Sequence, residues 1–179
     1  MRPIFLVGYM GCGKSTLSRA VSCLTGLTFI DLDKYIENRD HASVGDLFAL
    51  RGEQGFRILE QRMLHEVAEF ENVIVACGGG TPCFSDNMDY MNARGLTVWL
   101  DTPVDRLFSR LKRGRAKRPL IAGKSDEELL DFIRCTLESR KEFYAKAAET
   151  FCSELLENKA EIDATAQLFV DKMIMPQQH

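Results

Sequence analysis

The chain has 179 residues, enough for one domain with a buried core, and its composition is that of an ordinary globular protein. A net charge of −3 and an isoelectric point near 5.7 argue against nucleic acid as the main partner. No apolar run approaches membrane-spanning length, no leader precedes the first predicted strand, and the six cysteines lack metal-binding spacing, so we expect a cytoplasmic protein with reduced thiols.

The first predicted strand, 4–7, leads directly into residues 8–15, which read G-x-x-x-x-G-K-S. A strand before this motif and a helix after it are the context that a P-loop requires. The glycines let successive backbone N–H groups surround phosphate oxygens, Lys14 can reach the β- and γ-phosphates, and the Ser15 hydroxyl can bind Mg²⁺. A helix over 16–24 would direct its positive end at the same phosphates. The motif predicts that the chain binds a nucleoside triphosphate.

Short apolar runs alternate with longer amphipathic stretches, which is typical of βα units around a parallel sheet. The later strands are predicted at 28–32, 73–77, 97–100 and around 150–152. The later helices are predicted over 53–70, after a capping box at 125–128, and from Asp163 onward. In the helix over 53–70, one buried face is predicted for Phe56, Leu59, Met63, Val67 and Phe70.

Two acids, Asp31 and Asp33, end the second predicted strand. Strand alternation would place both carboxylates on one side. Beside a Mg·ATP site, one acid would hold a metal-bound water and the other would orient or deprotonate an acceptor hydroxyl. The alternative is that each is an ordinary capping acid before a helix that starts at Lys34.

The third predicted strand ends in Cys77 and three glycines, 78–80, where a Walker B acid usually stands. Three glycines allow the backbone to approach a small ligand closely. Asp101 follows the fourth strand and is also acidic, but Asp101-Thr102-Pro103 is typical of a helix entry. Asp31 is therefore the better candidate for the acid on the metal side.

Residues 112–118 contain five cations and precede Pro119. Such a run is usually a solvated surface loop. Because this run lies in an acidic protein that binds a polyphosphate, we favour a mobile lid that closes cations onto ATP.

Two arginines on predicted helical segments, Arg57 and Arg140, would suit a carboxylate if both point into the cleft, because guanidinium binds carboxylate bidentately. Glu60 follows Arg57 by three residues and could fix its guanidinium. Lone arginines are usually solvated or paired at the surface, and spacing alone does not single these two out.

Together these motifs resemble shikimate kinases, which are small P-loop kinases of the nucleoside-monophosphate-kinase fold, and the resemblance covers nearly the whole chain. The matching segments, in chain order, are GYMGCGKST at 8–16, DLD at 31–33, GEQGFRILE at 52–60, GGG at 78–80, RPLI at 118–121 and RKEFY at 140–144. The resemblance implies a three-layer α/β fold whose five-stranded parallel sheet has the order 2-3-1-4-5 and is flanked by helices. It also implies one domain over 1–179, with a core at 1–111 and 125–175, a mobile lid at about 112–124, and a substrate-binding helical region at about 33–61.

The same resemblance implies transfer of the γ-phosphoryl group of ATP to the 3-hydroxyl of shikimate, in the pathway to chorismate and the aromatic amino acids. The partners would be ATP, Mg²⁺ and shikimate, without nucleic acid or membrane, and the enzyme would be a cytoplasmic monomer. Catalysis is assigned to Lys14, Asp33 and Arg118, and nucleotide binding to Gly11, Cys12, Gly13, Lys14, Ser15, Thr16 and Arg118. Shikimate binding is assigned to Asp33, Arg57, Gly79 and Arg140, and the metal to Ser15 and Asp31.

Several points stay open at this level. Either Arg110 or Arg113 would border the adenine, whereas the thiols of Cys12 and Cys77 belong to no part of the family signature. A kinase of the same fold that acts on gluconate would share the P-loop and the lid. A non-catalytic nucleotide-dependent regulator would bind nucleotide without an acceptor.

Overall fold

The computed structural model describes residues 1–118 and 120–178, and it places five parallel strands in one sheet with the order β2-β3-β1-β4-β5. The strands are β1 (Ile4–Val7), β2 (Thr28–Asp31), β3 (Val73–Ala76), β4 (Leu96–Asp101) and β5 (Glu149–Cys152). This order and direction confirm the expected α/β fold.

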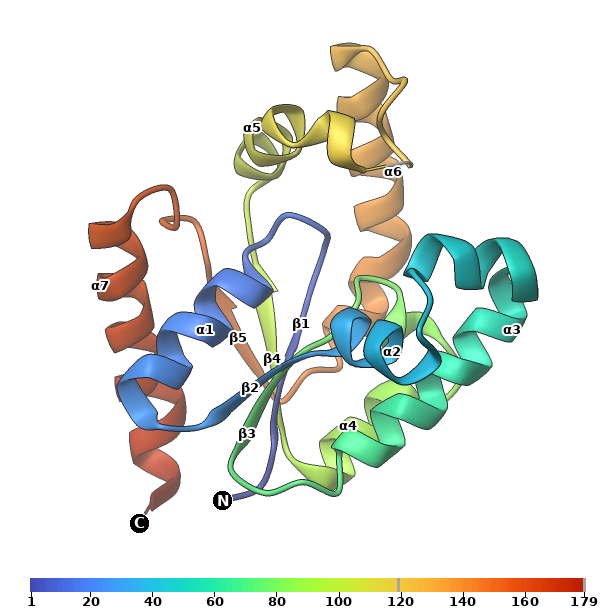
Figure 1. Cartoon of the computed structure of the whole chain (residues 1–179). Coiled ribbons are helices and arrows are strands. Elements are labelled where there is room, and N and C mark those ends of the chain that lie inside the picture. The colour runs from blue at the N-terminus through green and yellow to red at the C-terminus, as the bar shows by residue number, and fades with distance from the viewer. Residues whose placement is uncertain (119, 179) are drawn as a thin grey trace.

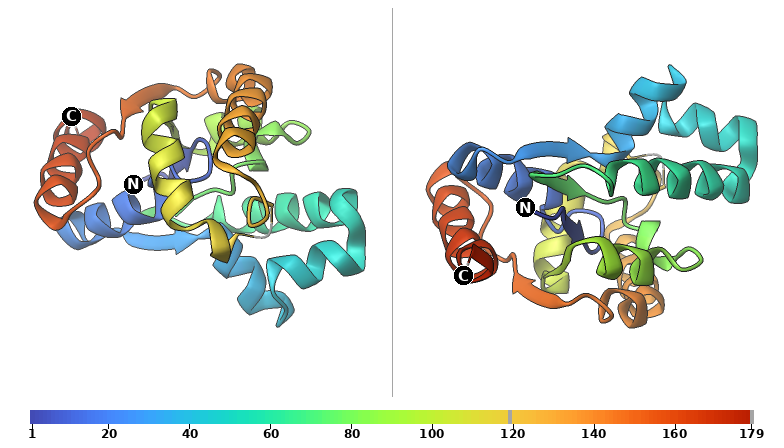
Figure 2. Two further views of the ribbon diagram at one scale, coloured as in Figure 1. Left: turned by 90° about the horizontal axis from the view of Figure 1, so that it is seen from above. Right: turned by 90° about the horizontal axis from the view of Figure 1, so that it is seen from below.

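The central strand β1 is buried on both faces, which explains its continuous apolar sequence. Ile4 and Leu6 point into one core, and Phe5 and Val7 point into the other. The first core packs α1 (Lys14–Thr25) and α7 (Lys159–Phe169) against the sheet. The second core packs α2 (Leu32–Asp40), α3 (Val44–Val67) and α4 (Asn87–Arg94) on the opposite face (Figures 1 and 2). The helices therefore form an outer layer on each side of the sheet.

Helix α3 differs from the predicted helix over 53–70. It begins at Val44, nine residues earlier than predicted, is interrupted by Gly52 (φ 68°, ψ 176°), and ends at Val67. The predicted face is buried as far as Val67, but Phe70 lies beyond the helix and is 38% exposed. The apolar spacing therefore located the buried face correctly and extended it too far.

Two later helices begin at side-chain caps. Helix α6 (Asp126–Tyr144) starts after Ser125, whose hydroxyl and Glu128 form the predicted capping box. Helix α7 starts at Lys159, earlier than the predicted Asp163, because the Asn158 side chain accepts a hydrogen bond from the N–H of Glu161.

All five strands end at the same edge of the sheet, where the loop after β1, helix α5 (Val104–Arg113) and the segment after it lie; both termini lie at the opposite end (Figure 1). A 3-10 turn at Arg115–Lys117 continues from α5. Pro119, part of the predicted lid and of the RPLI motif, is outside the described residues. Within the described parts of the chain, each helix is too short or too polar to cross a bilayer.

Candidate active site

The loop between β1 and α1 has the strand–loop–helix form that its motif predicts. Gly13 has a φ of 99°, a left-handed conformation that favours glycine, and a Cβ there would lie 2.3 Å from Cδ1 of Leu156. Lys14 begins α1, and its ammonium donates hydrogen bonds to the carbonyls of Gly8 (2.7 Å) and Tyr9 (2.9 Å). The lysine charge is therefore held over the loop, beside the positive end of α1.

A pocket of about 460 Å³ opens beside this loop and contains most of the residues predicted to bind nucleotide. These residues are Gly11, Gly13, Lys14, Ser15, Thr16 and Arg118. The remaining predicted residue, Cys12, belongs to the loop but is fully buried and does not line the pocket. Arg118 comes from the segment after α5, where its Nη1 donates a 3.1 Å hydrogen bond to the carbonyl of Gly114. The pocket thus combines a phosphate-binding loop with a cation from the predicted lid.

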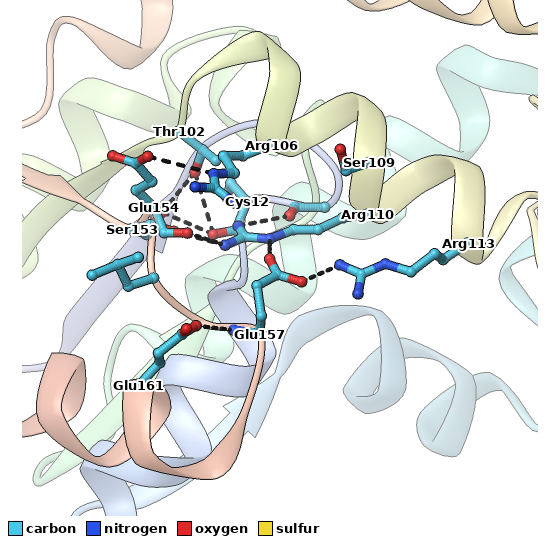
Figure 3. A network of polar contacts seen from close by, with 12 residues as sticks. Cys12, Thr102, Arg106, Ser109, Arg110, Arg113, Ser153, Glu154, Glu157 and Glu161 are labelled. Carbon is cyan, nitrogen blue, oxygen red and sulfur yellow. Dashed lines mark hydrogen bonds and ion pairs between the residues drawn. The ribbon is translucent and has the colours of Figure 1, made fainter.

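Arg110 is the centre of a polar network at one end of this pocket (Figure 3). Its Nε donates to Glu157 (2.7 Å), its Nη2 donates to the carbonyls of residues 153–154 (3.1 and 2.7 Å), and its Nη1 donates to the carbonyl of Gly11 (3.4 Å). Hydrogen bonds from Arg110 and then Arg113 hold the pKa of Glu157 below its usual value. The side chain of Arg110 is 12% exposed and that of Arg113 is 61% exposed, so Arg110 is the more firmly held of the two. Both line the pocket, and which of them borders the adenine stays open.

Ser15 and Asp31 meet at the opposite side of the phosphate-binding loop. The Ser15 hydroxyl donates a 2.8 Å hydrogen bond to Oδ2 of Asp31, and Oδ1 of Asp31 accepts one from the N–H of Lys34 (3.3 Å). Asp31 is therefore the cap of α2 and a neighbour of the P-loop serine at the same time. A hydroxyl and one carboxylate fit Mg²⁺, which keeps several waters and takes few protein ligands. No cluster of three or more His, Cys, Asp or Glu with metal-binding geometry occurs among residues 1–118 and 120–178.

Asp33 lies on the first turn of α2 and not on β2, so the predicted strand alternation of Asp31 and Asp33 is wrong. The strand ends at Asp31 because that side chain caps the helix, which begins at Leu32. Burial raises the pKa of Asp33 to about 6, and the nearby negative charges of Glu60 and Asp31 add to the effect. Asp33 is therefore a more basic carboxylate than an ordinary aspartate, and it is ionised above about pH 6.

None of the three glycines after β3 has a positive φ, so backbone conformation does not require glycine there. What requires glycine is the small space available for a side chain. A Cβ on Gly78 would lie 2.9 Å from Oε1 of Glu60 and 3.3 Å from Oδ1 of Asp33. A Cβ on Gly80 would lie 2.3 Å from Nη2 of Arg57. The glycines therefore let charged side chains approach the backbone closely, in addition to any ligand.

Gly79, between them, lies where the P-loop meets α6. A Cβ on Gly79 would lie 3.3 Å from Nη1 of Arg140 and 3.5 Å from the backbone nitrogen of Met10. The hydroxyl of Tyr144, on α6, donates a 2.6 Å hydrogen bond to the carbonyl of Gly79. Burial raises the pKa of Tyr144, so its hydroxyl stays protonated and available as a donor. Gly79 thus lies between the phosphate-binding loop and Arg140 and is close to both.

Arg57 and Arg140 line a second pocket of about 420 Å³, together with Gly80. Nη1 of Arg57 donates a 2.6 Å hydrogen bond to Oε2 of Glu60, as the three-residue spacing predicts. The guanidinium of Arg57 also lies 5.7 Å from the centre of the Phe56 ring. The two arginines therefore converge on one pocket, which is the arrangement that a carboxylate ligand needs.

Three contributions to the site were not predicted. Thr81 donates a 2.5 Å hydrogen bond to the buried Glu60, Tyr144 supports Gly79, and Arg110 joins the P-loop to the chain after β5. Thr81 directly follows the motif at 78–80, and Tyr144 is the last residue of the motif at 140–144. The motifs therefore indicated where these residues lie but not which groups they contact. Asp101 ends β4 and is exposed.

The sequence is similar to those of known proteins along nearly the whole chain. A sequence model of the family described as shikimate kinase matches residues 10–172. The shikimate kinase of Phocaeicola vulgatus is 54% identical over 173 residues, which cover 97% of this chain and 99% of that relative.

Solved structures have the same fold as this chain. The crystal structure of shikimate kinase from Bacteroides thetaiotaomicron has a TM-score of 0.92 at 50% identity, covering 95% of this chain and 97% of that one. A shikimate kinase from Acinetobacter baumannii, solved in complex with shikimate, has a TM-score of 0.83 at 30% identity, covering 100% of this chain and 96% of that one. The sheet and helices described above are therefore shared with these proteins from end to end.

Proposed function

This chain belongs to the shikimate kinase family, and from that membership we propose how its residues transfer the γ-phosphoryl group of ATP to the 3-hydroxyl of shikimate. The products are shikimate 3-phosphate and ADP, within the pathway to chorismate and the aromatic amino acids. The observation that carries the assignment of the site is the position of Gly79, which lies between the P-loop and Arg140. The phosphates of ATP at the P-loop and the carboxylate of shikimate at Arg140 would then lie on opposite sides of Gly79.

The nucleotide side of this site supplies positive charge. Lys14, the loop N–H groups and the N-terminal end of α1 would hold the phosphates, and Arg118 would approach them from the segment after α5. Positioning and charge neutralisation are the main contributions to catalysis of phosphoryl transfer. Mg²⁺, when bound, supplies further neutralisation of phosphate charge, and Ser15 and Asp31 are the residues that would hold it.

The acceptor side supplies orientation and a proton acceptor. Arg57 and Arg140 would bind the carboxylate of shikimate in the pocket that they line, and Gly79, beside Arg140, would lie next to the ring. Asp33 would accept a hydrogen bond from a ring hydroxyl, and its raised pKa makes it a better proton acceptor than an ordinary carboxylate at the moment of transfer. Closure of the segment at 112–124 would exclude water, which competes with the hydroxyl for the γ-phosphate.

We extend the proposal to the state of the protein in the cell. All six cysteines are free thiols, which is typical of a reducing compartment such as the cytoplasm. The family resemblance implies a monomer, and we propose that state for this chain.

ADP release in a coupled assay tests the reaction directly, with shikimate, gluconate and a nucleoside monophosphate compared as acceptors. We expect turnover with shikimate that requires Mg²⁺. Turnover with gluconate in its place would indicate a different small-acid kinase of the same fold, and nucleotide binding without any acceptor-dependent ADP release would indicate a regulator. Either result would overturn the proposed function.

A further inference from the structure

Two buried hydroxyls contact the backbone of the phosphate-binding loop, and neither is among the residues that line the pocket. Thr102 follows β4 and Ser153 follows β5, and their side chains are 4% and 0% exposed. Their oxygens are 2.6 Å apart. Ser153 Oγ also lies 2.8 Å from the carbonyl oxygen of Cys12, and Thr102 Oγ1 lies 3.4 Å from that same oxygen (Figure 3).

The distances indicate which hydroxyl donates to which acceptor. Each hydroxyl has one proton, so only one of the two donates to the other. The short contact from Ser153 to Cys12 indicates that Ser153 donates to the carbonyl, and Thr102 then donates to Ser153. Both protons are used, and hydrogen bonds in such a chain polarise one another in a buried setting.

The carbonyl of Cys12 is linked rigidly to the next N–H. In a planar trans peptide the C=O of one residue and the N–H of the next point in opposite directions. Holding the Cys12 carbonyl toward Thr102 and Ser153 therefore turns the N–H of Gly13 away from them, and Gly13 is a residue that lines the pocket. That N–H belongs to the loop whose N–H groups surround phosphate oxygens in a P-loop.

We propose that Ser153 and Thr102 are positioning residues for phosphoryl transfer, which hold the peptide between Cys12 and Gly13 in the orientation that binds nucleotide phosphate. This inference rests on the proposed role of the loop in binding ATP. Arg110 gives the same segment a second attachment, since it donates to the carbonyls of Gly11 and Ser153. The loop is therefore held at two consecutive carbonyls, that of Gly11 by Arg110 on α5 and that of Cys12 by Ser153 after β5.

Single and double substitutions separate the two hydroxyls. Ser153→Ala leaves Thr102 as a direct donor to Cys12, and Thr102→Val leaves Ser153 as one, whereas the double variant leaves that carbonyl without either hydroxyl. We expect about a threefold loss of ADP affinity in each single variant, the size of one net hydrogen bond. We expect a loss of more than about tenfold in the double variant, because neighbouring sites that share a partner are not additive. The kcat should fall in parallel, and the KM for shikimate should stay at its wild-type value.

Thr97→Val is the matched control. Thr97 is a buried threonine near the start of β4, whereas Thr102 follows the end of that strand, and the Thr97 hydroxyl donates to Asn92. All variants are measured by calorimetric titration with Mg²⁺ and ADP, by initial rates, and by Tm. We expect Thr97→Val to lower the Tm with unchanged ADP affinity, and Thr102→Ser, which keeps the hydroxyl, to restore ADP affinity.

A double variant whose Tm falls while its ADP affinity and kcat match those of Thr97→Val would overturn the positioning role. If the double variant does not fold, Ser153→Ala alone decides: wild-type ADP affinity in that variant counts against the inference. Failure of the wild-type protein to bind ADP at all would instead count against the proposed function.

Discussion

Arg57 and Glu60 form a buried ion pair, in which Oε2 of Glu60 accepts a 2.6 Å hydrogen bond from Nη1 of Arg57. Their side chains are 1% (Glu60) and 16% (Arg57) exposed. Oε1 of Glu60 accepts a second hydrogen bond from Thr81 at 2.5 Å, so the carboxylate is fixed from two sides. The guanidinium of Arg57 is therefore oriented by the protein itself, at the pocket that Arg57 lines together with Gly80.

We predict that Arg57→Ala raises the KM for shikimate severely and leaves the KM for ATP nearly unchanged. Truncating one partner of a buried charged pair costs roughly 2–5 kcal/mol, and here the second partner would be the carboxylate of the substrate. Initial rates at varied shikimate and at varied ATP measure the two constants. Arg57→Lys is the matched control: it keeps the charge without the bidentate geometry, and it should fall between alanine and wild type. A wild-type KM for shikimate in Arg57→Ala would show that Arg57 is not in the site.

We predict that Glu60→Gln lowers the Tm and raises the KM for shikimate, with little change in the KM for ATP. The amide keeps a hydrogen-bond acceptor for Thr81 but removes the charge that holds Arg57, and breaking one side of a buried ion pair is costly. The effect on shikimate should be smaller than that of Arg57→Ala, because the guanidinium is still present. Equal losses for both substrates would instead indicate general damage to the fold.

The sequence predicted those parts of the site that are local in the chain. The P-loop at 8–15 and the pairing of Arg57 with Glu60 depend on residues that are close in sequence, and the structure contains both. The network of Arg110 could not be predicted in this way, because its partners at 153, 154 and 157 lie 43, 44 and 47 residues further along the chain.

Local sequence patterns also left some helix and strand boundaries ambiguous, and contacts in the folded protein decide them. The alternation of Asp31, Leu32 and Asp33 fits the end of a strand, but the same residues fit a capped helix start, and the hydrogen bond from Lys34 to Asp31 selects the helix. Apolar spacing likewise continues to Phe70, although α3 ends at Val67. The order of the strands needed the family resemblance, since a run of βα units fits more than one order.

We predict that Asp33→Asn lowers kcat and at the same time raises the Tm at pH 7.5. The pKa of Asp33 is about 6 in the folded protein and near 3.8 when unfolded. Between these values the folded state holds the proton that the unfolded state has lost, so stability falls as pH rises through this window, by at most about 3 kcal/mol. Above pH 6 the loss is complete, and asparagine, which does not ionise, avoids it.

Thermal unfolding with EDTA, at intervals from pH 4 to pH 7.5, checks this sign. The Tm of Asp33→Asn relative to wild type should increase up to about pH 6 and then stay constant. A difference that does not vary with pH would show that Asp33 has no raised pKa. A kcat close to wild type would remove Asp33 from any role as a base or orienting group.

We predict that Gly80→Ala impairs shikimate binding through Arg57. A Cβ at this position would lie 2.3 Å from Nη2 and 2.7 Å from Cζ of Arg57, so the guanidinium must move. Gly80 has a φ of −95°, which alanine adopts without strain, so the fold itself should be little affected. The expected result is a raised KM for shikimate and an unchanged KM for ATP. The Tm should fall no further than that of Glu60→Gln, because moving the guanidinium disturbs its pair with Glu60 and nothing else.

In the double variant Gly80→Ala with Arg57→Ala, the glycine substitution should add nothing to the KM for shikimate, since the side chain that it displaces is already absent. Additive effects in that double variant would show that Cβ at residue 80 contacts the substrate directly. The three glycines would then act on the acceptor itself, and not through the charged side chains that approach them.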